Sequence, residues 1–164
     1  RCREIALYGR SPERAAACAD DLRAMGFQVA VCGSADDVAS SCELIVTTTA
    51  SRTPLFRADA VRPGTHVTGV GADAPGKQEL DTKLFARAEI VVADSIAQCA
   101  DHGDLAPALA SGDIALDRVQ ELGAVLANPA LGRTSEGQVS IADLTGVAVQ
   151  DIVIASHVMR RRSS

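Results

Sequence analysis

The chain has 164 residues, which is enough for one compact domain with a sizeable core. Hydrophobic residues make up 47% of the chain but aromatic residues only 2%, so small aliphatic side chains must fill that core, as in parallel strands covered by helices. The net charge of −5 argues against a nucleic-acid surface, and no apolar run reaches the roughly 18 residues of a membrane span. We therefore expect a protein that binds neither nucleic acid nor membrane. Five cysteines without CxxC spacing, and no signal-peptide pattern, favour a cytoplasmic protein.

Short apolar runs alternate with helical patterns along the whole chain. We expect strands over residues 4–10, 27–32, 43–50, 62–71, 89–95 and 138–146, and helices over residues 12–26, 34–42, 81–88, 96–112, 116–127 and 147–159. Ser11 before Pro12 is typical of a helix start, and Gly26 is typical of a helix end. Strands that alternate with helices of this length form βαβ units, so the sequence predicts a three-layer α/β domain with a mostly parallel sheet.

Polar residues gather after four of the expected strands. The segments are residues 9–11, 47–51, 69–73 and 94–95, and all are rich in Gly, Ser, Thr, Asp or Arg. Ligands of open α/β sheets bind beyond the carboxyl ends of the strands. The sequence therefore predicts a ligand site at this edge.

The first of these segments has the composition of a phosphate site. Arg10 is followed by Ser11 at a predicted helix N-terminus, and Arg14 lies one turn further on. In a dinucleotide-binding fold an acid at this place binds the ribose 2′-hydroxyl of NAD, whereas an arginine accommodates the 2′-phosphate of NADP. A guanidinium, a hydroxyl and a helix dipole favour a phosphate. The alternative is a helix cap beside a solvated arginine.

No metal site is expected from the cysteines or histidines. The five cysteines have no CxxC spacing and read as free thiols of a reducing compartment. His66 lies inside an expected strand, where a packed, hydrogen-bonded histidine is commoner than a catalytic base. His102 and His157 have no metal-ligand spacing.

The segment VTGVGADAPGKQELD, residues 67–81, contains three glycines and a proline around one aspartate. Gly69 and Gly71 would let the backbone approach a flat ligand closely. Asp73 would then project from the strand end into the same crevice, where a carboxylate can act as a general acid or base. The alternative is a turn aspartate that caps local amides before Pro75.

Together these motifs closely resemble the ornithine cyclodeaminase/μ-crystallin family. The resemblance is carried by LIVTTTASRTPLF, THVTGVGADAPGKQELD, IVVADSIAQCADHGDL and GRTSEGQVSIADLTGVAVQDIVIA, in the family's order. It covers residues 4–155, nearly the whole chain. It implies a Rossmann domain that binds NAD(H) or NADP(H), and an activity on amino acids, imines or related small molecules.

The resemblance also implies roles for single residues. Asp73 corresponds to the proposed acid/base of the family's cyclodeaminases. Lys77 and Asp81 would shape the loop and cap the next helix rather than contact substrate. The positions that correspond to cofactor-lining residues are Thr47, Thr48, Val70, Gly71, Thr145 and Gly146.

Two departures from the family's pattern modify these expectations. Many members that use NAD carry an acid where this chain has Arg10, so we expect NADP(H) in preference to NAD(H). The family's first strand, its glycine-rich phosphate loop and the whole substrate domain, which usually builds a homodimer, should precede Arg1. We therefore expect residues 1–164 to be part of a chain roughly twice as long, and to be inactive alone.

Three functions stay open at this point. The first is an ornithine cyclodeaminase-like oxidoreductase or deaminase with Asp73 as acid/base. The second is a ketimine reductase, a pyrroline-carboxylate reductase or an alanine dehydrogenase-like enzyme. The third, of another class, is a protein similar to μ-crystallin that binds NADPH and a small ligand without significant turnover.

Overall fold

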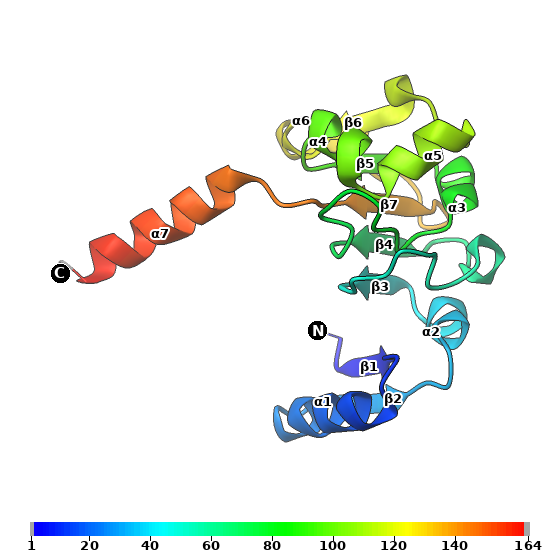
Figure 1. Cartoon of the computed structure of the whole chain (residues 1–164), viewed down its shortest axis with the longest axis vertical. Helices are drawn as coiled ribbons and strands as arrows, with labels where there is room; N and C mark the ends of the chain where they lie inside the picture. The colour runs from blue at the N-terminus through cyan, green and yellow to red at the C-terminus, as the bar shows by residue number, and fades with distance from the viewer. Residues whose placement is uncertain (1, 163–164) are drawn as a thin grey trace.

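The computed structural model describes residues 2–162 and consists of short parallel strands connected mainly by helices (Figure 1). The strands are β1 (Glu4–Leu7), β2 (Gln28–Val31), β3 (Leu44–Thr47), β4 (His66–Gly69), β5 (Ile90–Ala93), β6 (Val119–Glu121) and β7 (Ser140–Asp143). The α-helices are α1 (Pro12–Ala24), α2 (Ala35–Ser41), α3 (Thr82–Arg87), α4 (Ile96–His102), α5 (Leu105–Ser111), α6 (Leu122–Ala127) and α7 (Ala148–Arg162). Single 3₁₀ turns are η1 (Ala58–Ala60), η2 (Leu116–Arg118) and η3 (Pro129–Leu131).

The strands form two sheets, and every pairing within them is parallel. β1 pairs with β2, and the second sheet has the order β3-β4-β7-β5-β6. The last strand, β7, therefore lies between β4 and β5, where Ile141 pairs with Val67 on one side and Val91 on the other. The predicted α/β fold with a parallel sheet is confirmed.

The two sheets face each other through strands that each have one unpaired edge. β1 pairs only with β2, and β3 pairs only with β4. Figure 1 shows β1 and β3 on the facing sides of the two sheets, with α2 carrying the chain from one sheet to the other. On β3 the side chains of Leu44 and Val46 are 64% and 58% exposed, which is unusual for the apolar residues of a parallel strand.

Two predicted helical segments differ in the structure. Residues 116–127 were expected to be one helix, but they form η2, β6 and α6, because Val119 pairs with Val91 of β5 and is buried. Residues 96–112 form two helices rather than one, since α4 ends at Gly103 and α5 begins at Leu105. A Cβ at Gly103 would overlap Asp143, so only glycine lets the chain turn there.

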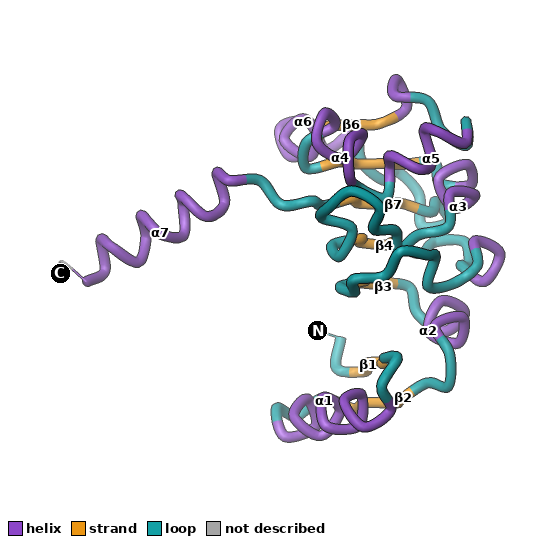
Figure 2. The backbone as a smooth tube through the Cα atoms, viewed as in Figure 1, coloured by secondary structure: helices purple, strands orange, loops and turns teal. Residues whose placement is uncertain are grey.

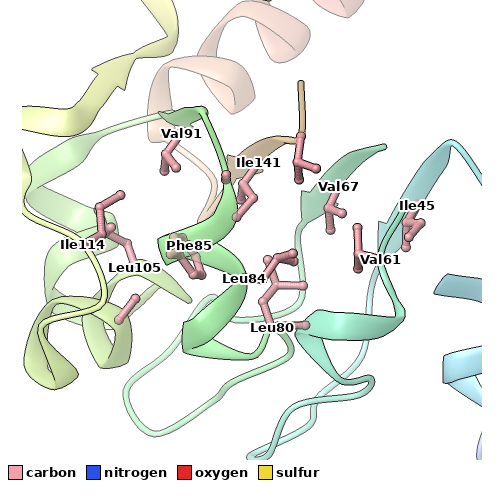
Figure 3. Close-up of a cluster of buried hydrophobic side chains, with 14 of the residues drawn as sticks. Ile45, Val61, Val67, Leu80, Leu84, Phe85, Val91, Leu105, Ile114 and Ile141 are labelled. Atoms are coloured by element: carbon pink, nitrogen blue, oxygen red, sulfur yellow. The ribbon is translucent and has the colours of Figure 1, made fainter. Parts of the chain in front are cut away.

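The core lies between the five-stranded sheet and the helices that cover it (Figures 2 and 3). Its largest apolar side chains come from β3, β4, β5, β7, α3 and α5, together with the loops that lead into them. They include Ile45, Val61, Val67, Leu80, Leu84, Phe85, Val91, Leu105 and Ile141. The composition predicted an aliphatic core, and Phe85 and Phe56 are its only aromatic members among the described residues.

Helix α7 extends away from the body of the molecule (Figure 1). Its apolar side chains are exposed on the described part of the helix: Val149, Ile152, Val153, Ile154, Val158 and Met159. The helix has 15 residues, and no helix in residues 2–162 is both long and apolar enough to cross a membrane.

Candidate functional site

The turn between β1 and α1 contains an open cavity beside two arginines. Ser11 caps α1, because its Oγ accepts a hydrogen bond from the Arg14 backbone N–H at 3.4 Å. The cavity has a volume of about 310 Å³, and Tyr8, Arg10, Ser11 and Arg14 lie in its wall. Within residues 2–162 neither guanidinium forms an ion pair. Two cations and a helix N-terminus at one cavity can bind an anion.

The loop after β3 is held from inside the protein. Thr47 is buried, and its hydroxyl donates a hydrogen bond to Oε2 of Glu79 at 2.7 Å. The backbone N–H of Thr49 donates to the other oxygen, Oε1, of the same carboxylate. Thr48, between them, is exposed. Of the predicted cofactor-lining pair, Thr48 is thus the side chain that solvent reaches.

Gly69, the last residue of β4, and Gly71, just after it, are both crowded by protein groups. A Cβ at Gly69 would lie 3.0 Å from Oδ2 of Asp104. A Cβ at Gly71 would overlap the backbone of Thr49 and lie 2.6 Å from Oε1 of Glu79. In the structure, contacts with other protein groups explain the glycines at these positions, whereas the sequence suggested the close approach of a ligand. Val70, between them, is 39% exposed.

Asp73 lies on the exposed loop that follows β4. Its carboxylate forms a hydrogen-bonded ion pair with the ammonium of Lys77. This hydrogen bond and the Lys77 charge lower the pKa of Asp73 from its ordinary value, so the side chain is ionised at neutral pH. The ion pair between Lys77 and Asp73 was not predicted from the sequence. The prediction for Asp81 is confirmed, since its Oδ1 accepts from the Lys83 N–H and caps α3.

The ends of β5 and β7 are joined by the carboxylate of Asp94. Its Oδ1 accepts from the hydroxyl of Thr145 at 3.2 Å, and its Oδ2 accepts from the backbone N–H of Gly146 at 2.8 Å. Gln98 of α4 donates to both residues, at 3.0 Å to Thr145 Oγ1 and at 2.6 Å to the Gly146 carbonyl. Gly146 has φ +80°, a conformation that favours glycine. The predicted Thr145-Gly146 pair therefore forms a fixed turn at the same edge.

Two further carboxylates are buried under this edge. Asp104 accepts from the backbone N–H groups of Glu79 and Leu80, and Asp143 accepts from that of Leu105. Burial is the main cause that raises the pKa of Asp104 to about 6 and that of Asp143 to about 7. The negative charges of Asp104 and Asp94 raise the pKa of Asp143 further. Oδ2 of Asp104 and Oδ1 of Asp143 have no hydrogen-bond partner among the described residues.

Sequence reasoning missed most of the residues that hold these loops. Glu79, Asp104 and Asp143 are all fully or almost fully buried, whereas a charged residue in a sequence reads as exposed by default. One signal was available. Each of the three is followed directly by a leucine, in QEL, GDL and ADL.

Three of the four predicted segments lie at the carboxyl edge of one sheet, after β3, β4 and β5. Residues 47–51 and 69–73 meet at Glu79, and residues 94–95 meet the Thr145-Gly146 turn at Asp94. Arg10, Ser11 and Arg14 lie on the β1–β2 unit, which belongs to the other sheet.

His66 and the cysteines were considered as possible functional residues. His66 is half-buried, with Nδ1 2.8 Å from Ser140 Oγ and Nε2 3.1 Å from Thr68 Oγ1, which confirms a packed, hydrogen-bonded histidine. All five cysteines are free, and Cys99 is buried. In the described residues no group of His, Cys, Asp or Glu side chains has the arrangement of a metal site.

The chain is similar to known proteins of one family. The model of the ornithine cyclodeaminase/mu-crystallin family matches residues 1–164. The alanine dehydrogenase of Archaeoglobus fulgidus is 42% identical over 118 residues, which are 71% of this chain and 36% of that protein. The iminosuccinate reductase of Paracoccus denitrificans is 36% identical over 159 residues, which are 97% of this chain and 49% of that protein.

Solved structures agree in fold. The crystal structure of the Paracoccus denitrificans iminosuccinate reductase in complex with NAD⁺ has a TM-score of 0.89, at 36% identity, over 98% of this chain and 49% of that one. An archaeal alanine dehydrogenase dimer with bound NAD has a TM-score of 0.87, at 34% identity, over 93% of this chain and 47% of that one. The chain spans half or less of the length of these relatives. Because the family model matches the chain from its first residue to its last, the chain belongs to the ornithine cyclodeaminase/mu-crystallin family.

Proposed function

We propose that this chain forms most of the nicotinamide-nucleotide-binding domain of an oxidoreductase or deaminase that acts on an amino acid or a cyclic imine. The observation that carries the proposal is the joined set of loops at the carboxyl edge, where residues 69–73 and 47–51 meet, in a chain that matches this family over its whole length. Its relatives include an alanine dehydrogenase and an iminosuccinate reductase, and the latter binds NAD⁺.

Residues of this chain fit a dinucleotide. At the β1–α1 turn, Arg10, Arg14 and the capped helix N-terminus would hold a phosphate in a cavity of about 310 Å³. Thr48, Val70 and the Thr145-Gly146 turn would line the rest of the cofactor. The bound nicotinamide would supply a hydride acceptor or donor. The protein would orient the substrate carbon towards it and exclude water.

Asp73 is the acid/base in this proposal. Its carboxylate is ionised and reaches solvent from the loop that leaves β4, so it can accept a proton from a substrate amine or from water. Lys77 would keep the carboxylate charged until substrate binds.

The test is an Asp73→Asn change in the full-length protein. We expect turnover to fall by about 100-fold or more, while NADPH binding, followed by nicotinamide fluorescence, stays within about twofold. Turnover that survives undiminished would contradict the assignment of Asp73. A wild-type protein that binds NADPH but turns over no amino acid or imine would instead support a μ-crystallin-like binding protein.

The cofactor is proposed to be NADP(H) in preference to NAD(H). Arg10 stands where an acid would bind the ribose 2′-hydroxyl of NAD, and its guanidinium has no ion-pair partner among the described residues. Arg10→Ala should therefore raise the Kd of NADPH by about tenfold and leave that of NADH nearly unchanged. Wild-type protein that prefers NADH would contradict the proposal.

Reduction of an imine is the second candidate, and it is favoured by the similarity to the iminosuccinate reductase and to Δ1-pyrroline-2-carboxylate reductases of Bacillus cereus. A cyclodeaminase consumes ornithine without net oxidation of its cofactor. Incubation with ornithine, and separately with a cyclic imine and NADPH, distinguishes the two by whether the absorbance of NADPH falls.

The complete enzyme is proposed to contain a further strand between β1 and β3, a substrate domain and a second subunit. The unpaired edges of β1 and β3, exposed Leu44 and Val46 and the exposed apolar residues of α7 support additional covering protein. An archaeal alanine dehydrogenase of the same fold is a dimer. Light scattering of the full-length protein tests the homodimer.

A further inference from the structure

Glu79 is fully buried and lies beneath the loop that carries Asp73. Its side chain enters no ion pair within residues 2–162, and its relative exposure is 0%. A buried carboxylate without a cation must be stabilised by hydrogen-bond donors. Glu79 obtains three such donors, one from the last residue of β3 and two from the loops after β3 and β4.

The three donors lie at or just beyond the carboxyl ends of two neighbouring strands. Oε2 accepts from the hydroxyl of Thr47, the last residue of β3, and from the backbone N–H of Gly71, just after β4, at 2.7 Å each. Oε1 accepts from the backbone N–H of Thr49. One carboxylate thus ties the loop after β3 to the loop after β4.

The position of Glu79 is itself fixed by another acid. Its backbone N–H donates to Oδ1 of Asp104 at 2.7 Å, and the N–H of Leu80 donates to the same oxygen at 2.9 Å. The glycine at position 71 completes the arrangement, because a Cβ there would overlap Thr49 and crowd Glu79. The carboxylate therefore has one position relative to both loops.

From this geometry we propose that Glu79 is a positioning residue of the reaction. It touches neither substrate nor cofactor, but it sets where Asp73 stands relative to residues 47–49, since Gly71 is only two residues before Asp73. The inference rests on the proposed function, because it assigns Asp73 to the chemistry. A displacement of about 1 Å in a reacting group can cost about 100-fold in rate.

The test compares Glu79→Gln with Glu89→Gln in the full-length protein. Glutamine at 79 keeps the size of the side chain, but its NH₂ must face the N–H of either Gly71 or Thr49, so one tie breaks in either orientation. Glu89 offers the matched control, because it also accepts a backbone N–H, that of Val139 at 2.8 Å, but at the opposite ends of the strands.

We expect Glu79→Gln to lower kcat by about 10- to 100-fold and to change the KM of the amino acid or imine much less. Amide hydrogen exchange should become faster both in peptides that cover residues 47–51 and in peptides that cover residues 69–76. Glu89→Gln should change neither kcat nor the exchange of these peptides. Unchanged kcat in Glu79→Gln, or faster exchange in neither or only one of the loops, would overturn the proposal.

A second variant guards against misfolding of Glu79→Gln. Thr47→Val removes only the hydroxyl donor and keeps both backbone ties, so exchange should rise less than in Glu79→Gln, and kcat should fall less. If wild-type enzyme has no turnover with any nicotinamide cofactor, the proposed function fails. The exchange measurements still decide, independently, whether Glu79 joins the two loops.

Discussion

Asp73 and Lys77 form an ion pair near the surface that keeps the Asp73 carboxylate ionised. The two residues are four positions apart on one loop, and the ammonium of Lys77 contacts the carboxylate directly. An exposed pair of this kind contributes little to folding stability, since water screens it. Its consequence is chemical instead, because the neighbouring cation holds the carboxylate in its proton-accepting form.

Replacing Lys77 should change the pH dependence of the reaction. In Lys77→Met the pKa of Asp73 rises from its lowered value towards the ordinary 3.8, because the hydrogen bond and the positive charge that lower it are gone. The acidic limb of the kcat/KM profile should move to higher pH. Lys83→Met, the same change in α3, serves as control and should leave the limb in place. A limb that is identical in both variants would contradict a role for Asp73 as the titrating group.

Asp143 should make folding stability depend on pH. Its pKa in the folded protein is about 7, whereas the unfolded chain has the ordinary 3.8, so the folded state holds a proton that the unfolded state releases. Stability from this group is therefore fully present below about pH 4 and declines as the pH rises to about 7. The loss is on the order of a few kcal/mol.

Asp143→Asn removes this proton exchange and keeps an acceptor for the Leu105 N–H. Urea unfolding of the full-length protein at several pH values between about 4 and about 8 should show a flatter decline in the variant than in wild type. Asp117→Asn, at an exposed position, is the control and should keep the wild-type slope. Equal slopes in all three proteins would show that Asp143 is ionised in both states.

At the scale of elements, helix α1 has two separable roles at one residue. Ser11 caps its N-terminus by accepting from the Arg14 N–H, and it also lies in the wall of the β1–α1 cavity. A cap contributes to the stability of the helix whether or not a ligand is present. A phosphate would use the same positive end of the helix.

Substitutions at Ser11 should separate these roles. Ser11→Ala loses the cap, so the free energy of unfolding should fall by about 1 kcal/mol, and NADPH should bind more weakly. Ser11→Asp keeps a good cap but adds a negative charge where the phosphate would lie, so stability should be retained while NADPH affinity falls. Denaturant unfolding and fluorescence titration measure the two effects. Undiminished NADPH binding by Ser11→Asp would place the phosphate elsewhere.

Local patterns were sufficient to predict most elements but not the contacts at their ends. The Ser11-Pro12 start of α1 and the strands that alternate with helices are encoded within a few residues, and they were predicted correctly. β6 was missed because its three residues form a strand only by pairing with β5. The ties made by Glu79 and Asp94 join residues 8 to 52 positions apart, so no local pattern could reveal them.

At the scale of the whole molecule, the described residues leave apolar surface uncovered. Exposed apolar side chains lie on α7, which extends away from the body of the molecule, and on β3, the edge strand of the larger sheet. Surfaces of this kind are normally covered by other protein. In the full-length enzyme that we propose, the substrate domain would complete this edge. The described residues would then supply one wall of the substrate crevice.

Residues 1–164 alone should therefore be inactive. A purified protein of this length is expected to show no turnover of alanine, ornithine or a cyclic imine with NADP(H) or NAD(H), whereas the full-length enzyme is active with one of them. Spectrophotometric assay of nicotinamide oxidation and reduction checks this. Measurable turnover by the shorter protein would mean that the crevice needs no second wall.

The position of β7 has a consequence for how the molecule reaches its native state. His66 pairs with Ser140, 74 positions later, and the same strand also separates β4 from β5. During synthesis β4 and β5 therefore leave the ribosome before β7, so the edges that pair with β7 are unpaired at first. Until residues 140–143 arrive, the unpaired N–H and C=O groups of these two edges are open to other strands, so the nascent chain is exposed to aggregation until its sheet is closed.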